Sequence, residues 1–270
     1  MIFALLLASP DYEGIALAFL RATGPDLRGC SIQRRSHAIR SGTVEFELIE
    51  NNHQPDQRKP YRHFVVDLDL DGRVVWASNY GLVHRRVYRL YDASKKVLTR
   101  EQAHAALKKW AKKWPAPPGY VERSFTYADE RGDSWSAYDR NVSGYWLGES
   151  VVYSIDTRSG EMSRFGAPKP SRIGVTKLTV SRADAIKVAQ AALGDVERRY
   201  GKHYLTSCKV EFERRPDSKP GTSVADLGYT LRFAPFGTSH PTLGYRGATV
   251  RVSADGKLLR PPSVMQVKGG

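Results

Sequence analysis

Three stretches of the chain alternate apolar and polar residues and then run into a glycine. The apolar members are Phe64, Val66 and Leu68 before Gly72, Val151, Tyr153 and Ile155 before Gly160, and Ala248, Val250 and Val252 before Gly256. A period of two predicts strands with one buried face, and glycine suits a tight turn because it tolerates positive φ. The pattern predicts three β-hairpins. The middle set lies one residue further from its glycine, which predicts one extra residue in that turn.

The three hairpins recur at a long and similar spacing. Gly72, Gly160 and Gly256 are 88 and then 96 residues apart. Each glycine is followed by a charged residue and then by an apolar one. A repeat of this length, with the same order of elements inside it, predicts tandem small units rather than a thin solenoid.

A helix is predicted ahead of each hairpin. In the first, Ser9 is the expected N-cap with Pro10 at the first helical position, and a short apolar stripe follows at Ile15, Ala18, Phe19 and Ala22. The second has a capping box formed by Thr99 and Gln102, with one apolar face made by Ala103, Leu107, Trp110 and Trp114. The third begins at Ser181, with Asp184 at the capping-box position, and its apolar face is Ile186, Ala189, Leu193 and Tyr200.

Further strands are predicted between the helices and the hairpins, for example where Val44, Phe46 and Leu48 alternate with glutamates. Each unit therefore consists of a helix followed by three to four antiparallel strands. This order predicts an α+β fold in tandem small units, each with one helix packed on a curled antiparallel sheet. The expected units are 1–95, 96–170 and 171–270, with a polar loop at 51–59 and a linker at 166–170.

The chain is strongly basic, since 42 Lys and Arg stand against 28 Asp and Glu in 270 residues, a net charge of +14. Such a charge attracts nucleic acid, acidic polymers of a cell envelope or acidic protein faces, although a solvated basic surface is the plainer interpretation. One cluster lies on the outer side of the second helix and is a candidate basic face, made of Lys108, Lys109, Lys112 and Lys113.

The first eight residues are apolar but too short to span a bilayer. They are interpreted as the remnant of an export signal, or else as the lead-in to the first folded element. The two cysteines, Cys30 and Cys208, are each expected in the first strand after a helix, in units one and three. Units arranged in a row would hold these strands apart, which predicts free thiols or an intermolecular link.

Several segments resemble motifs of metal binding or catalysis, but each lacks a feature that the motif requires. Residues 67–72 have the D-x-D-x-D-G form of a calcium loop, but Ser78 occupies the position where such a loop needs a glutamate. Residues 221–225 resemble a nucleophile elbow only faintly, because they lead into a strand. His203, Cys208 and His240 lack zinc-type spacing. The sequence therefore predicts no catalytic residue, no cofactor and no metal.

Tyr145 and Trp146 form a candidate binding loop ahead of the second hairpin. They stand between Gly144 and Gly148, outside the alternating residues. Loops on rigid sheets often carry binding residues, and aromatic side chains are common anchors. The alternative is that Trp146 folds back over the sheet edge and closes the core of the second unit.

Two pairs of segments resemble a known family. LTREQAHAALKKWAKK with NVSGYWLGESVVYSIDTRSGEM, and LTVSRADAIKVAQAAL with ATVRVSADGKLL, are similar to PepSY-type domains of the YcdB/YcdC tandem-repeat kind. The resemblance implies a cystatin/PepSY-like fold and an extracytoplasmic, non-catalytic module that restrains a peptidase or binds the cell envelope. Its partner would be a protein, such as a peptidase, or an anionic envelope polymer. A basic nucleic-acid-binding protein and a hydrolase of unrecognised type are the alternatives.

Overall fold

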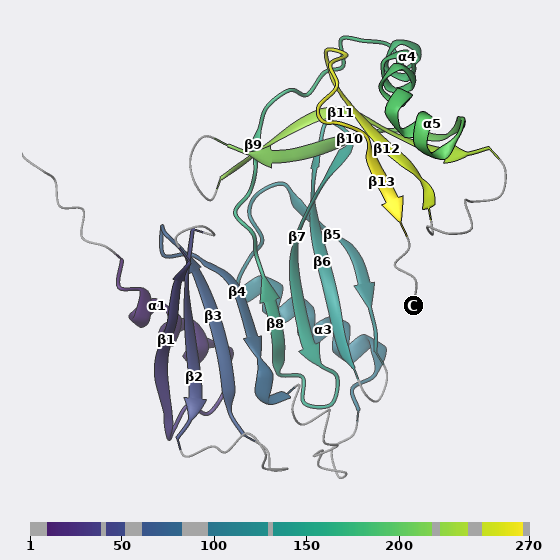
Figure 1. Ribbon diagram of the computed structural model, residues 1–270. Coiled ribbons are helices and arrows are strands. Elements are labelled where there is room, and N and C mark those ends of the chain that lie inside the picture. Colours follow the sequence, from purple (N-terminus) through teal and green to yellow (C-terminus); the bar gives the residue numbers. More distant parts are fainter. Residues whose placement is uncertain are drawn as a thin grey trace, which may run out of the picture. The chain divides into compact units, whose positions relative to one another are not determined.

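The computed structural model describes residues 10–38, 42–51, 61–82, 97–128, 132–217, 222–236 and 245–266 (Figure 1). The chain divides into two compact units. The N-terminal unit comprises Met1–Arg140, Glu149–Pro170 and Ser218–Gly221, and the C-terminal unit comprises Asn141–Gly148, Ser171–Asp217 and Thr222–Gly270. The sequence predicts three units, and that division stays a prediction.

The N-terminal unit is built from two runs of one helix and four strands. The first run consists of α1 (Tyr12–Thr23), β1 (Cys30–Ala38), β2 (Thr43–Glu50), β3 (His63–Asp69) and β4 (Val74–Asn79). The second run consists of α3 (Arg100–Lys113), β5 (Tyr120–Thr126), β6 (Asp133–Val142), β7 (Tyr145–Asp156) and β8 (Met162–Gly166). The tip of the β6–β7 hairpin, Asn141–Gly148, is counted with the C-terminal unit.

All eight strands of these two runs form one sheet, in the order β1-β2-β3-β4-β8-β7-β6-β5 (Figure 1). Both helices contribute to a single apolar core, in which Phe19 and Leu107 join Val66 and Tyr153 of the sheet. The core residues of β2, β3 and β7 alternate along their strands, so α1 and α3 cover the same face of the sheet. An α+β architecture with a large antiparallel sheet is confirmed.

The two runs meet where their last strands pair. β4 and β8 are antiparallel, and Ala77 lies opposite Phe165. The expectation that each predicted unit carries a sheet of its own is therefore wrong for the first two. Pairing between distant edge strands depends on tertiary packing, which alternation within one strand does not encode.

The predicted hairpins are present. The nine apolar residues listed before the three glycines are all buried, with exposed fractions between 0% and 4%. The turns close by backbone bonds from Gly72 to Asp69, from Gly256 to Ser253 and from Gly160 to Asp156. The third bond spans four residues where the others span three, so the extra residue expected in the middle turn is confirmed.

The C-terminal unit has a five-stranded sheet. Its elements are β9 (Arg172–Ile173), α4 (Arg182–Ala192), α5 (Gly194–Tyr200), β10 (His203–Pro216), β11 (Ser223–Pro235), β12 (Tyr245–Ser253) and β13 (Ser263–Gln266). The order is β10-β11-β12-β13, and β9 pairs in parallel with β11. Ala185, Ala189 and Leu193 of the helical segment pack on β11 and β12.

The helix starts agree with the capping signals in two of three cases. Thr99 and Gln102 form the expected capping box, and the Ser181 hydroxyl accepts from the Asp184 amide. The first helix differs, because Asp11 and not Ser9 is its N-cap, with the Asp11 carboxylate accepting from the Gly14 amide. An aspartate is as good an N-cap as a serine, so the residue types alone could not show whether Ser9 or Asp11 caps the helix.

Some predicted features lie outside the described residues. These are the apolar segment 1–8, most of the polar loop 51–59, Gly221 and His240. Within the described ranges no helix is long and apolar enough to cross a membrane.

Candidate functional site

Helix α1 carries more apolar surface than the core covers. Ala16, Phe19 and Leu20 are its buried residues. Ile15 and Ala22 are only partly buried and Ala18 is exposed. The stripe predicted from the sequence therefore lies mainly beside the core rather than in it, and only Phe19 belongs to both.

The less buried residues of this stripe, Ile15, Ala18 and Ala22, form one wall of a groove within the N-terminal unit, which we call the helix groove. Its volume is about 480 Å³, within the range of about 300–1,000 Å³ that small-molecule and cofactor pockets occupy. The lining residues come from α1, from the end of α3 and from β4, β8 and their flanks, and they are mostly apolar: Ile15, Ala18, Phe19, Ala22, Arg73, Val74, Trp114, Pro115, Phe165 and Ala167.

Three aromatic residues of the groove lining contact one another. The ring centroid of Phe19 lies 5.0 Å from that of Trp114 and 5.6 Å from that of Phe165. The hydroxyl of the fully buried Tyr153 donates to the Trp114 carbonyl. These contacts join the aromatic part of the groove lining to the core of the N-terminal unit.

The rim of the helix groove is cationic. Lys113 donates to the carbonyl of Ala22 at the end of α1, and its ammonium lies 5.0 Å from the centroid of the Trp114 ring. A cation is favourable at a helix C-terminus and over an aromatic face. Arg73 contributes a second positive charge to the lining.

The remaining lysines of the predicted basic face precede Lys113 on α3. Lys108, Lys109 and Lys112 are exposed, as is Lys113. Their positions on the outer side of the helix agree with the sequence prediction, and their role in binding stays a prediction. Together with Lys113 they extend the positive charge away from the groove.

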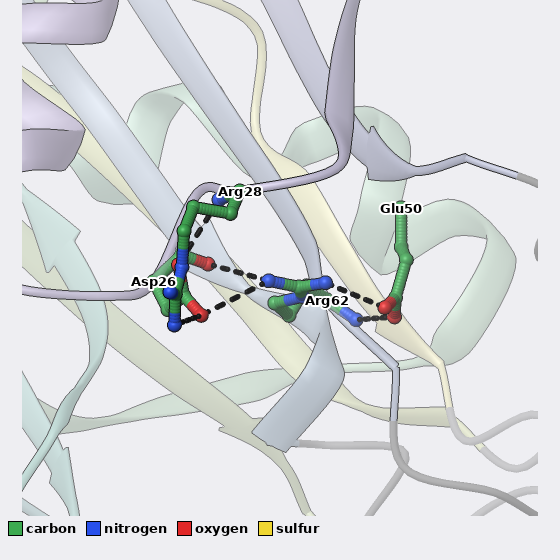
Figure 2. Close-up of polar contacts among 4 residues, drawn as sticks. All are labelled: Asp26, Arg28, Glu50 and Arg62. Carbon is green, nitrogen blue, oxygen red and sulfur yellow. Dashed lines mark hydrogen bonds and ion pairs between the residues drawn. The ribbon is translucent and has the colours of Figure 1, made fainter.

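A separate polar cluster lies at the end of β1, β2 and β3. Figure 2 shows Arg62 between two carboxylates, with its Nη2 atom 2.6 Å from Glu50 Oε1 and its Nη1 atom 3.3 Å from Asp26 Oδ2. Arg28 also pairs with Asp26, and its hydrogen bonds lower the pKa of the Asp26 carboxyl to about 2. Two cations and two anions balance here, so the cluster serves to tie the segment after α1 to the sheet.

Cys30 begins β1 next to this cluster. Burial raises the pKa of the Cys30 thiol, and the nearby Arg62 offsets this in part. A raised pKa disfavours the thiolate, which is the nucleophilic form. Cys30 and Cys208 are both free and both lie in the first strand after a helix.

Glu149 is a buried carboxylate of β7, with a side chain that is 0% exposed. It accepts a 2.8 Å hydrogen bond from the Tyr120 hydroxyl and lies 3.7 Å from Arg140 Nη1. Burial, and then this hydrogen bond, raise the pKa of Tyr120 well above its ordinary value. Tyr120 is thus a fixed hydrogen-bond donor at neutral pH.

On the opposite face of the sheet, His63 and Glu47 make a contact between two strands that was not predicted from the sequence. His63 Nε2 lies 2.6 Å from Glu47 Oε1, and the Glu47 side chain is only 2% exposed. The Tyr61 hydroxyl lies 3.4 Å from the other ring nitrogen. The alternating glutamates of β2 could be seen in the sequence. The register between β2 and β3, which places Glu47 beside His63, could not.

Tyr145 and Trp146 do not form a loop. The hairpin turns at Ser143 and Gly144, which have φ of 52° and 85°, and both aromatic residues belong to strand β7. Tyr145 packs against an apolar cluster of the C-terminal unit that includes the fully buried Leu147. The two-residue turn needs positive φ at both positions, and Ser143 gave no clear sign of this. A binding role for the pair stays a prediction.

The rejected motifs have structural roles where they are described. The Asp69 carboxylate accepts from the amides of Asp71 and Arg73 and so holds the first turn. His203 and Cys208 lie in β10. Throughout the described ranges no group of three or more His, Cys, Asp or Glu side chains is placed to hold a metal ion.

Comparison with known proteins gives one structural neighbour to report. No protein-family model matches the chain, and no curated protein does. Among solved structures the chain is similar to the Bacillus megaterium YpeB C-terminal domain, with 13% sequence identity and a TM-score of 0.43 over 95% of this chain and 96% of that one. At that level of similarity, neither function nor site residues are transferred.

Proposed function

We propose that the chain is a non-catalytic binding module whose helix groove takes an extended or helical segment with apolar and acidic side chains from a protein partner. The observation that supports this most directly is the pairing of an apolar groove with a cationic rim. Ile15, Ala18 and Ala22 offer apolar area at the groove, while Lys113 and Arg73 supply positive charge beside it.

The recognition would divide between the two kinds of surface. Apolar side chains of the partner would gain from burial against Phe165 and Trp114, and aromatic anchors commonly dominate such contacts. Acidic side chains would lie over Lys113 and Arg73. Charge complementarity of this kind raises the association rate and selects against basic segments.

The partner class and location follow the sequence resemblance. A PepSY-type module would act outside the cytoplasm, and a peptidase is the protein partner that the resemblance implies. The raised pKa values of Cys30 and Tyr120 disfavour the reactive anionic forms of these two side chains.

The proposal is tested with a fluorescent peptide in which Leu and Phe alternate with Asp and Glu. Binding is followed by anisotropy, and a second peptide carries Lys in place of the acidic residues. We expect binding of the acidic peptide alone. Ala18→Glu places a carboxylate in the groove and should weaken binding at least about tenfold, or about 1.4 kcal/mol.

A matched control is available on the other helix. Ala105 is exposed on α3 and does not line the groove, so Ala105→Glu makes the same change of charge elsewhere and should leave binding unchanged. Equal effects of both variants, or equal binding of the two peptides, would overturn the groove as the site.

Polyanion binding by α3 is the second candidate, supported by the exposure of Lys108, Lys109 and Lys112. We expect the chain to bind polyglutamate and a short DNA duplex, and replacing all three lysines by Glu should abolish this binding. Binding to DNA would fall steeply with salt because neutralised phosphates release counterions. Retention of polyanion binding by the triple variant would exclude this face.

A further inference from the structure

The last strands of the two runs in the N-terminal unit pair about a local two-fold axis. Ala77 and Phe165 lie opposite each other, and each is five residues after its turn glycine, Gly72 or Gly160. The neighbouring pairs are related in the same way. Trp76, four residues after its glycine, lies opposite Gly166, six residues after the other glycine, and Ser78 and Arg164 make the reverse pair. Equivalent residues thus make reciprocal contacts, as in an isologous interface.

The C-terminal unit has a strand in the equivalent place. Leu258 follows Gly256 by two residues, as Met162 follows Gly160, and each bridges to the preceding strand, Leu258 to Val252 and Met162 to Ile155. The pairing then lapses at Pro261 and resumes in β13, where Val264 lies opposite Ala248. β13 is therefore the counterpart of β4 and β8.

Unlike β4 and β8, β13 ends its sheet. The strand order stops at β13, so among the described residues no strand pairs with its outer edge. An edge strand offers a row of backbone donors and acceptors to another chain. Pro261 and Pro262, which lack an N–H, limit that row on its N-terminal side, so it begins at Ser263.

The apolar side chains around this edge are also more exposed than their counterparts in β4 and β8, which are buried or partly buried. Leu258 and Leu259 are 40% and 42% exposed, and Val264 and Met265 are 37% and 36% exposed. In the paired strands, Ala77, Met162 and Phe165 are between 4% and 8% exposed. Exposed apolar side chains beside a free edge favour association.

We propose that β13 pairs antiparallel with β13 of a second copy of this chain, which gives a reversible two-fold dimer. A second copy is the occupant because the molecule already joins two equivalent last strands in this way at β4 and β8. A closed dimer requires a self-complementary surface, and an antiparallel pair of identical strands provides one.

Salt should strengthen the dimer. Each copy carries a net charge of +14, and like charges repel until they are screened. The apolar contacts and backbone bonds at β13 do not depend on opposite charges. Self-association should therefore increase with ionic strength, whereas polyanion binding should decrease.

Sedimentation velocity and light scattering across a wide concentration range, at low and high salt, test the proposal. We expect the mass to rise from 30.2 kDa toward twice that value with concentration, and to do so sooner at high salt. Val264→Lys adds a charge at the edge and should keep the protein monomeric.

Val121→Lys is the control, because Val121 is 52% exposed on β5, an edge strand of the other sheet. This variant should dimerise as the wild-type chain does. Circular dichroism of each variant checks that it is folded. A wild-type chain that stays monomeric at all concentrations, or a folded Val264→Lys variant that still dimerises, would overturn the proposal.

Discussion

The ring centroids of Phe19 and Trp114 lie 5.0 Å apart, so the aromatic end of α3 rests directly against α1. Phe19 is 6% exposed and also contacts Phe165. Phe19 therefore belongs both to the core and to the wall of the helix groove, and a substitution at Phe19 would change stability and binding together. Substitutions at smaller neighbouring residues are needed to change binding without a loss of stability.

Phe19→Ala should lower the free energy of unfolding by about 3–5 kcal/mol, because it leaves a cavity between both helices and the sheet. Chemical denaturation followed by circular dichroism measures this. Ala18→Glu on the same helix should change stability by no more than about 0.5 kcal/mol, since Ala18 is exposed. Similar losses for the two variants would contradict the assignment of two distinct stripes on α1.

Lys113→Ala should destabilise the N-terminal unit by about 0.5–1 kcal/mol. The substitution removes the bond to the Ala22 carbonyl and the contact with the Trp110 and Trp114 rings. Lys112 is exposed beside it and makes no such contact in the described structure, so Lys112→Ala should have an effect near zero. A denaturant melt of each variant gives its free energy of unfolding. Equal values for the two variants would mean that the contact of Lys113 with α1 does not stabilise the protein.

Asp67→Asn should stabilise the protein at neutral pH. Burial, and then the neighbouring Glu45, raise the pKa of Asp67 from its ordinary 3.8 to about 6, and its buried Oδ1 atom has no hydrogen-bond partner in the described structure. A raised pKa means that the folded state holds the proton more tightly. The wild-type protein should thus lose stability as the pH rises from about 4 through about 6.

The expected gain for Asp67→Asn is about 1 kcal/mol at pH 7–8, after allowance for solvent screening of a partly exposed group. The gain should shrink toward zero below about pH 4, where the wild-type carboxyl is protonated. Thermal melts at several pH values measure the difference. A gain that does not depend on pH would point to packing and not to the charge.

Leu147→Ala should destabilise the C-terminal unit by about 2–5 kcal/mol, because Leu147 is 0% exposed among Phe212, Ala225 and Leu227. Tyr145→Phe keeps the ring that packs against this cluster and should cost less than about 0.5 kcal/mol. Hydrogen exchange of β11 amides, together with a denaturant melt, locates the loss. A negligible effect of Leu147→Ala would contradict the placement of the hairpin tip in this core.

Most of the helices and strands could be predicted from the alternation of apolar and polar residues and from the helix-capping residues. Val66, Tyr153 and Val250 were expected to be buried because they sit at a period of two, and each is 0% exposed. The pairing of Ala77 with Phe165 was not predictable in this way, because it joins residues far apart in sequence and depends on both edges being uncovered at once.

The candidate site was only partly visible in the sequence. The lysines of α3 could be assigned to an outer face from helical periodicity, and they are exposed. The helix groove was not predicted, since Ile15 and Ala22 look like ordinary core residues until Ala16 and Leu20 are seen to fill the core instead. Which side of a small apolar helix faces inward depends on its rotation, and its composition does not fix that rotation.

The pairing of β4 with β8 makes the two halves of the N-terminal sheet dependent on each other for solubility. Either half alone would present Trp76 or Phe165 along a bare strand edge, which invites aggregation. The ladder also joins segments nearly ninety residues apart, and contacts of such long range form slowly. A chain emerging from synthesis would therefore carry an uncovered β4 until β8 has been made, and this interval is when a chaperone would be of most use.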